Sequence, residues 1–283
     1  MSKIDIRSMY LPELENYLSE MGEPRFRAKQ IFHWLQSGVT DFDEMTDISK
    51  ALRERLKADA YIASAETERR YASRLDETVK YVFRLFDGEL IETVLMKYEH
   101  GYTVCISTQV GCRMGCKFCA SGINGLTRSL TASEMLAQIT AVQRDNNIRV
   151  SNIVMMGMGE PLDNFDNSVR FLKLVSDENG LNIGLRHISL STSGVVSGIK
   201  KLKDYNLPIT LSISLHAPSD DIRSSVMPVN KRWSIDELLA ACKEYQAVTT
   251  RRISFEYALI DGVNNSDACA DMLAKKLRGI MCH

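Results

Sequence analysis

Residues 103–119 read TVCISTQVGCRMGCKFC, a strand-like apolar run followed at once by three closely spaced cysteines. Cys112, Cys116 and Cys119 form a C-x3-C-x2-C pattern, and Gly111 and Gly115 allow the tight backbone turns that a loop around one centre needs. Three thiolates leave one iron of a 4Fe-4S cluster open to a small molecule, whereas a structural zinc site needs four protein ligands. The pattern therefore predicts these three cysteines as ligands of an iron–sulfur cluster with one open position.

The competing interpretation is a zinc site that takes Cys105 as its fourth ligand. Cys105 lies seven residues before Cys112, inside the predicted strand TVCISTQV, so the cluster is favoured. Cys242 and Cys269 fall on the apolar faces of predicted helices and are expected to be core thiols. Seven cysteines without an export signal indicate a reducing compartment, and we expect a cytoplasmic protein.

After residue 100, strand-like runs alternate with helical ones, which is typical of parallel strand–helix units. The runs are TVCISTQV, TASEMLAQITAVQR, NIVMMGMG, FDNSVRFLKLV, RHISLSTSG, VVSGIKKLK, PITLSISLHA, SIDELLAACKEY, RRISFEYALI and SDACADMLAKKL. Capping boxes of the S/T-x-x-E type mark two helix starts, Thr131 with Glu134 and Ser234 with Glu237. About five units can be counted before Cys282-His283, where a sixth barrel strand would begin. We therefore expect an α/β fold, a partial (β/α) barrel that lacks its last strand.

The chain before residue 100 has a different pattern. Residues 24–36, PRFRAKQIFHWLQ, place apolar side chains at helical spacing, and helices should dominate to about residue 60. From Tyr61 to about Tyr98, short runs divided at Asp87-Gly88 predict antiparallel strands joined by a turn. The predicted division is a helical accessory domain at 1–60, an antiparallel strand extension at 61–100 and the core at 101–283.

Composition argues against some classes of function but does not identify the function. The 283 residues are 45% hydrophobic, and no apolar run approaches the roughly 20 residues that span a bilayer, so no membrane association is expected. The net charge of −1 gives no general attraction to nucleic acid. Local basic clusters are more typical of a solvated surface than of phosphate binding, so no residue is assigned to RNA. The clusters are Arg69, Arg70 and Arg74; Lys200, Lys201 and Lys203; and Lys231, Arg232, Arg251 and Arg252.

Several motifs, taken in order, resemble those of one enzyme family. They are PRFRAKQIFHWL, IETV, CISTQVGC, CKFCASG, MMGMGEPL, LSTSGVV, ISLHAP and the MPVN segment at 227–230. Each is weak alone, but their joint order and spacing are highly specific and run over essentially the whole chain. The cysteine triplet resembles the radical S-adenosylmethionine (SAM) superfamily, and the whole set is similar to the RlmN/Cfr family of RNA adenine methyltransferases.

The resemblance implies methylation of C2 of an adenine in 23S rRNA and of an adenine beside the anticodon in tRNA. It also implies a 4Fe-4S cluster, SAM, and an electron donor such as flavodoxin or ferredoxin. In the family, a methylated cysteine near the C-terminus carries the methyl group to the base. Cys105 matches the cysteine that resolves the adduct by forming a disulfide, and Glu92, in IETV, matches the acceptor of the C2 proton. On the residues alone, Cys105 could be an inert strand thiol and Glu92 a surface partner of Lys97.

The resemblance further implies the residues of the SAM pocket. Gly159 and Glu160, in GMGEP, match the loop that holds the amino-acid part of SAM, where a carboxylate suits an ammonium group. Ser191 and the run Ser214-Leu215-His216 match later strand ends that complete the pocket. Alternation along LSISLH independently places its serines and its histidine on one face. On the residues alone, GMGEP could be only a turn, and a lone strand histidine is usually structural.

The sequence departs from the family near its C-terminal end. Nothing matches the family segment that carries the methylated cysteine, and Cys282, which precedes the expected last strand, is not that residue. We therefore expect a C-terminally incomplete copy of a normal enzyme, with cluster binding but little methyl transfer. A naturally shortened, inactive homologue is the alternative, because a missing strand would leave an unpaired sheet edge.

Two other functions stay open at this point. One is a C8-adenine methyltransferase of the same family, although GMGEP and STSGVV look more like the C2 branch. The other is a zinc-stabilised RNA-binding protein without catalysis.

Overall fold

The computed structural model describes residues 3–283, which divide into two compact units. The first unit holds the chain up to Ser107 together with Leu130–Ile153 and Asp166–Gly184. The second unit holds Thr108–Ser129, Val154–Phe165 and Leu185–His283. The three segments predicted from the sequence are consecutive stretches of the chain, whereas each of these units combines separate stretches. The predicted division therefore stays a proposal.

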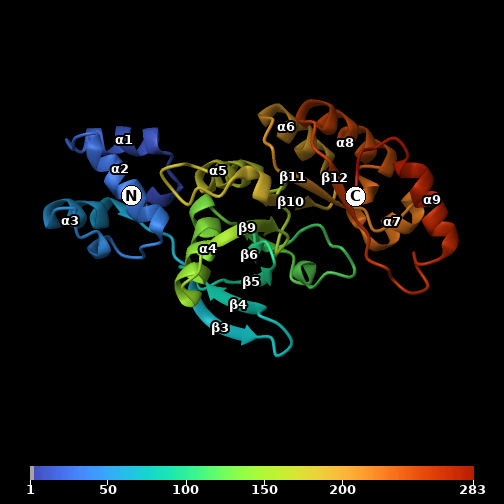
Figure 1. The fold of residues 1–283 in the computed structure, drawn as a ribbon, viewed down its shortest axis with the longest axis horizontal. Helices are drawn as coiled ribbons and strands as arrows, with labels where there is room; N and C mark the ends of the chain where they lie inside the picture. Colours follow the sequence, from blue (N-terminus) through green and yellow to red (C-terminus); the bar gives the residue numbers. More distant parts are fainter. Residues whose placement is uncertain (1–2) are drawn as a thin grey trace. The chain divides into compact units, whose positions relative to one another are not determined.

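The first unit opens with helices α1, α2 and α3, which gather near the N-terminus (Figure 1). Its helices are α1 (Leu11–Glu20), α2 (Phe26–Ser37), α3 (Lys50–Asp59) and α4 (Ala132–Asn146), with short 3-10 helices η1 (Ile6–Ser8) and η2 (Phe42–Glu44). Its strands are β1 (Ile4–Asp5), β2 (Ala60–Tyr61), β3 (Glu66–Ala72), β4 (Val79–Arg84), β5 (Leu90–Tyr98) and β6 (Gly101–Cys105). Residues of both units occur in β9 (Val150–Met155) and α5 (Phe165–Val175).

The apolar face predicted for residues 24–36 is the buried face of α2. Its apolar side chains Ala28, Ile31, Phe32 and Leu35 are all buried. The helix ends at Gly38, whose φ of +97° is a left-handed conformation that glycine adopts without strain. The predicted helix is confirmed.

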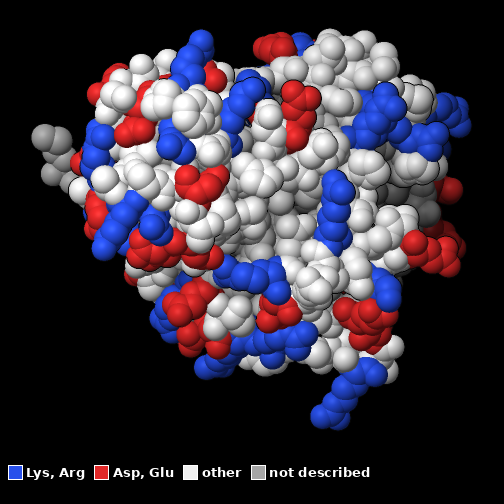
Figure 2. Space-filling view, turned by 60° about the vertical axis from the view of Figure 1, so that its left-hand side comes forward, with Lys and Arg blue, Asp and Glu red and all other residues white. Residues whose placement is uncertain are grey.

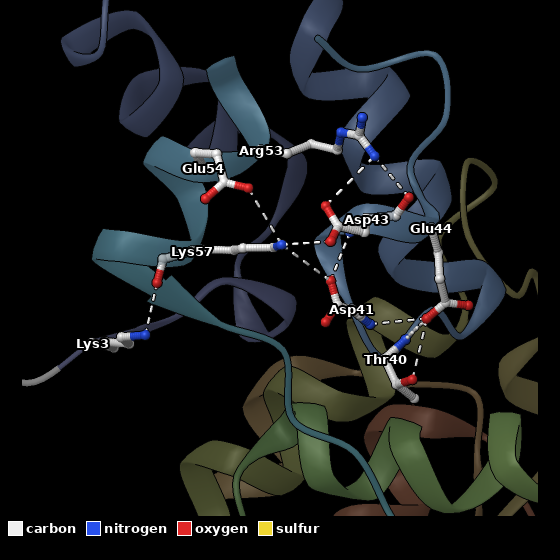
Figure 3. A network of polar contacts seen from close by, with 8 residues as sticks. All are labelled: Lys3, Thr40, Asp41, Asp43, Glu44, Arg53, Glu54 and Lys57. Carbon is white, nitrogen blue, oxygen red and sulfur yellow. Dashed lines mark hydrogen bonds and ion pairs between the residues drawn. The ribbon is translucent and has the colours of Figure 1, made fainter. Parts of the chain in front are cut away.

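Ion pairs connect α3 to the segment that precedes it (Figure 3). Lys57 Nζ lies 2.6 Å from Asp43 Oδ2 and 3.8 Å from Asp41 Oδ1. The hydrogen bond from Lys57 lowers the pKa of Asp43. Glu44 accepts hydrogen bonds from the backbone N–H groups of Thr40 and Asp41. Because these pairs are on the surface, they contribute little stability and mainly fix the local geometry.

The strands β3, β4, β5 and β6 pair antiparallel in chain order. The turn between β4 and β5 passes through Gly88, whose φ is +86°, and Leu85 N donates to Glu89 O at 2.9 Å. This turn contains the Asp87-Gly88 pair at which the sequence was divided. The predicted antiparallel strands and their turn are confirmed.

The second unit is built on three parallel strands, paired in chain order: β10 (Ile188–Thr192), β11 (Thr210–Ser214) and β12 (Ile253–Glu256). Its helices are α6 (Val196–Tyr205), α7 (Asp220–Val226), α8 (Ile235–Thr249) and α9 (Asp267–Leu277), with η3 (Ala120–Gly122), η4 (Leu185–His187) and η5 (Pro228–Lys231). A separate hairpin pairs β7 (Gln109–Gly111) with β8 (Leu126–Ser129). Within residues 3–283, no helix combines the length and apolar character needed to cross a membrane.

The α/β fold predicted from the sequence is confirmed. Parallel strands alternate with helices, and the strands of residues 3–283 form open sheets rather than a closed barrel. Cys242 and Cys269 are buried thiols, as predicted. Both predicted capping boxes are present, Thr131 with Glu134 and Ser234 with Glu237.

One strand prediction is wrong, because TVCISTQV is not a single strand. The strand β6 ends at Cys105 and β7 begins only at Gln109. The backbone N–H groups of Thr108 and Gln109 donate instead to the carbonyl of Met158. A ladder that continued through these residues would need the same N–H groups, so the strand is interrupted.

The last two residues lie beside β12. Cys282 forms an isolated parallel bridge with Ile253, and Phe255 N donates to His283 O at 2.9 Å. This is where the sequence predicted that a further parallel strand would begin.

The buried face of α2 gives a test of the fold. Ile31→Ala is expected to lower the free energy of unfolding by about 2–5 kcal/mol, because it leaves a cavity among buried side chains. Lys29→Ala, on the exposed face of the same helix, is the matched control and should change it by less than about 0.5 kcal/mol. Urea unfolding followed by circular dichroism measures both, and equal effects would contradict this assignment of the faces.

Candidate active site

The cysteine loop comprises residues 112–125 and is closed at its base by the β7–β8 hairpin. Gly111 pairs with Leu126 in the hairpin, and Cys112 N donates to Gly125 O at 2.9 Å. A Cβ atom on Gly111 would lie 2.0 Å from Gly125 O, so only glycine fits at that position. The three cysteines are therefore carried on a loop whose two ends are held together.

The segment that ends α7 supports this loop. Lys117 N donates to Val226 O at 2.9 Å. Val226 and Met227 belong to a buried apolar cluster that packs against Met114 and Cys116. The MPVN motif, which begins at Met227, thus holds the cysteine loop in place.

The three cysteines line one cavity of about 160 Å³. All of its lining residues belong to the second unit. Among the residues predicted from the sequence, the lining includes Cys112, Cys116, Cys119, Gly159, Glu160, Ser191, Ser214 and His216. Leu215 is buried and lies outside the lining. The structure therefore brings the predicted cluster ligands and most of the predicted SAM contacts to one space.

Burial dominates the chemistry of the two inner thiols. Burial raises the pKa of Cys116 to about 11, and repulsion by Cys112 and Cys119 adds to the shift. Burial likewise raises the pKa of Cys112. Metals bind thiolates rather than thiols, so cluster binding would remove the protons of all three cysteines, and the iron ions themselves would supply the positive charge that favours this.

Glu160 joins the loop after β9 to the loop after β10. Its carboxylate is almost fully buried and accepts hydrogen bonds from Leu162 N at 3.0 Å and Ser193 N at 2.7 Å. Burial raises the pKa of Glu160, while these backbone donors oppose the shift. Gly159 has a φ of +103°, and a Cβ there would lie 2.6 Å from Gln109 Cβ. The GMGEP motif is therefore more than a turn, because it carries a buried acceptor to the cavity.

Two strand-end serines share one carboxylate. Ser191 Oγ and Ser214 Oγ donate to Glu256 Oε2 at 3.4 Å and 3.3 Å. Glu256 is the last residue of β12 and pairs in register with Ser214. This set of hydroxyls and a carboxylate suits the hydroxyl and ammonium groups of a small polar ligand.

His216 lies just beyond β11 with a φ of +54°. Its Nδ1 accepts a hydrogen bond from Ala258 N at 2.9 Å, and its ring meets Phe118 edge to face, with the centroids 5.0 Å apart. Burial, with a smaller contribution from Arg223, lowers the pKa of His216 to about 4. The imidazole is therefore neutral at pH 7 and carries its proton on Nε2, which makes Nε2 a donor.

Glu92 and Cys105 lie in the first unit. Glu92 Oε1 is 2.6 Å from Lys80 Nζ, and the Glu92 side chain is 48% exposed. The surface partner suggested from the sequence is wrong, because Lys97 pairs with Glu77 instead. A diagonal neighbour on the adjacent strand is within easier reach of Glu92 than Lys97 on its own strand. Cys105 ends β6 and is partly exposed.

Two charged residues of the site were missed by the sequence analysis. Glu256 carries a usable signal, since it lies within the predicted strand RRISFEYALI, and it ends β12 at the level where Ser214 ends β11. Arg223 carries none, because nothing near it in the sequence indicates that it is buried beside the cavity.

The residues present fit a cluster and SAM. Cys112, Cys116 and Cys119 would hold the cluster, and the lining contains no fourth cysteine. Glu160, Ser191, Ser214 and His216 would hold SAM beside it. Over the described range 3–283, no three Cys, His, Asp or Glu side chains are arranged as ligands of a single metal ion.

Two family models match the chain. The Radical SAM superfamily matches residues 106–273, and the Ribosomal RNA large subunit methyltransferase N-terminal domain matches residues 4–62. The first match contains the cysteine loop and every lining residue of the cavity.

Similar proteins match over the whole chain. A "Probable dual-specificity RNA methyltransferase RlmN" from Alkaliphilus oremlandii is 55% identical over 100% of this chain and 82% of its own length. The protein of the same name from Alkaliphilus metalliredigens is 51% identical over 100% of this chain and 80% of its own length. A crystal structure of a radical SAM methyltransferase from Sphaerobacter thermophilus gives a TM-score of 0.94 at 47% identity, covering 99% of this chain and 83% of that one. The chain therefore belongs to the radical SAM superfamily and, within it, to the RlmN family of RNA methyltransferases, enzymes that use a 4Fe-4S cluster and SAM.

Proposed function

We propose that this enzyme methylates C2 of an adenine in 23S rRNA and of an adenine beside the anticodon in tRNA. The observation that carries the proposal is the single cavity shared by the cysteine triplet, Glu160 and the strand-end serines. Such a cavity lets a redox cluster and a small polar molecule meet out of bulk water. Adenine C2 is not nucleophilic, so a site of this kind suits its methylation better than direct polar transfer does.

The predicted cluster and SAM residues each have a proposed role. Cys112, Cys116 and Cys119 hold the cluster, which together with SAM supplies radical chemistry. Glu160 accepts from the ammonium group of SAM, and Gly159 allows the close backbone approach. Ser191, His216 and the Ser214–Leu215 segment complete the SAM pocket, with Leu215 contributing through its backbone rather than its side chain.

Two further residues with proposed roles belong to the first unit. Glu92 accepts the proton from adenine C2; its side chain is half-exposed on β5 and pairs with Lys80. Cys105 resolves the protein–RNA adduct, which couples its thiol to the methyl-carrying cysteine in a disulfide. Residues 3–283 contain no disulfide, so a disulfide is not part of the resting fold of this part of the chain. None of the seven cysteines is assigned as the methyl carrier.

RNA and an electron donor such as flavodoxin or ferredoxin are the proposed partners, and the cytoplasm is the proposed location. Several cations of the basic clusters are already paired, since Arg70 contacts Asp145 and Lys203 contacts Glu244. Figure 2 shows Lys and Arg interspersed with Asp and Glu on the face it presents. No residue is therefore assigned to RNA. The zinc-stabilised binding protein is not retained, because the family uses a cluster.

Removing one predicted ligand tests the cluster site. Anaerobically reconstituted wild-type protein is expected to hold about four irons and four sulfides per chain, and Cys116→Ala should lose most of both. Cys242→Ala, a buried cysteine on α8, is the matched control and should keep the cluster. Iron, sulfide and zinc analysis measures the outcome, and one zinc without sulfide in the wild type would contradict the proposal.

The buried histidine gives a pH dependence. The pKa of His216 is about 4, below its ordinary value of 6.5, so only the unfolded chain binds this proton between these values. The stability that the neutral His216 side chain contributes is fully present above pH 6.5 and is lost as the pH falls toward 4. In metal-free protein, His216→Asn should flatten this decline in urea unfolding, whereas His187→Asn, at an exposed histidine, should not. The same pH dependence in both variants would be the contrary result.

Mapping of the modified base tests the reaction. With SAM, a reductant and unmodified 23S rRNA or tRNA, any methylated adenosine is expected to carry its methyl group at C2. In a chain that also holds the methyl-carrying cysteine, Glu92→Gln should lower the yield by about 100-fold or more, as expected for the loss of a general base. Glu89→Gln, at a partly exposed glutamate before β5, is the control and should leave the yield unchanged. Mass spectrometry of the nucleosides distinguishes the isomers, and a C8 product would contradict the proposal.

A further inference from the structure

Arg223 is a fully buried cation whose hydrogen bonds all go to neutral oxygens. It lies on α7 with 0% of its surface exposed. Its Nε donates to Leu215 O at 3.0 Å, and its Nη2 donates to Ser193 O at 2.6 Å and Ser214 O at 3.0 Å. Its Nη1 donates to Asn230 Oδ1 at 3.1 Å. The guanidinium therefore clamps the loops that follow β10 and β11, both of which border the cavity.

These hydrogen bonds satisfy the donors of Arg223 but do not neutralise its charge. In the described part of the chain Arg223 forms no ion pair, and its link to Asp220 runs through Asn230, whose Nδ2 donates to Asp220 Oδ1 at 2.9 Å. Burial lowers the pKa of Arg223 to about 10, which still leaves the side chain protonated at neutral pH. A buried charge without a partner is strongly unfavourable, so a compensating anion is needed.

The cysteine loop places such an anion next to α7. Val226 and Met227, three and four residues after Arg223, pack in the cluster that touches Cys116. Met227 N donates to Arg223 O at 2.7 Å, and Lys117 N donates to Val226 O. The loop that carries Cys116 is thereby tied to the end of the helix that carries Arg223.

We propose that Arg223 is the buried counter-charge of the iron–sulfur cluster, and that its charge makes the cluster easier to reduce. This inference rests on the proposed assignment of the three cysteines as ligands. A cluster held by three thiolates is anionic, and each added electron increases that charge. A fixed cation nearby, shielded from water, therefore favours the reduced state. Arg223 is a positioning residue rather than a catalytic one.

The reduction potential tests this role, because a purely structural arginine would not set it through charge. In anaerobically reconstituted holoenzyme, an EPR-monitored redox titration should show a more negative midpoint for Arg223→Gln. We expect the ratio of reduced to oxidised cluster to fall about tenfold at the wild-type midpoint, which is about 59 mV for one electron. Arg223→Lys keeps the charge but loses part of the clamp, and should stay close to the wild type. Arg186→Gln, at an exposed arginine before β10, is the control and should not shift.

A second variant keeps Arg223 and places a carboxylate beside it, which neutralises its charge. Asp220→Asn together with Asn230→Asp exchanges two side chains that already contact each other and keeps the net charge. The exchange moves the carboxylate from position 220 to position 230, whose side chain contacts the guanidinium directly. We expect the midpoint to become more negative, as in Arg223→Gln.

Two results would overturn the inference: unchanged midpoints in both Arg223→Gln and the exchange variant, or an Arg223→Lys shift as large as that of Arg223→Gln. Either result leaves the cluster site itself intact. Retention of the cluster by Cys116→Ala would instead remove the ligand assignment on which the inference rests.

Discussion

Two opposite charges are buried where the parallel strands of the second unit end, and the shape of the cavity depends on how they are satisfied. Glu160 is 2% exposed and accepts from the N–H of Ser193, while Arg223 is 0% exposed and donates to the carbonyls of Ser193 and Ser214. Both charges thus hold the loop after β10. A shift of that loop would leave these buried groups without hydrogen-bond partners, which is strongly unfavourable. The walls of the cavity are consequently fixed by hydrogen bonds as well as by apolar packing.

The predictable features were those with a local signature. The cysteine spacing, the apolar face of residues 24–36 and the alternation of strands and helices each reflect contacts along one segment, and the folded chain has the corresponding loop, helix and α/β order. The capping boxes could be predicted for the same reason, since the hydrogen bonds of each box form within four residues. Family motifs added the positions of Glu160 and the strand-end serines, which line the cavity together.

The features that could not be predicted depend on segments far apart in the sequence. The interruption between β6 and β7 follows from the Met158 carbonyl, about fifty residues away, which binds Thr108 and Gln109. Lys80 became the partner of Glu92 because of strand register, and the burial of Arg223 follows from loops that meet only in the folded unit. Periodicity describes which face of an element is buried, but it does not say which distant group will meet it.

One cavity of the second unit is proposed to hold both the cluster and SAM. An anaerobic crystal structure of the reconstituted enzyme with SAM tests it most directly. We expect the cluster on Cys112, Cys116 and Cys119, with SAM beside it against Glu160 and the strand ends of β10 and β11. A cluster on other cysteines, or SAM bound outside this cavity, would contradict the account.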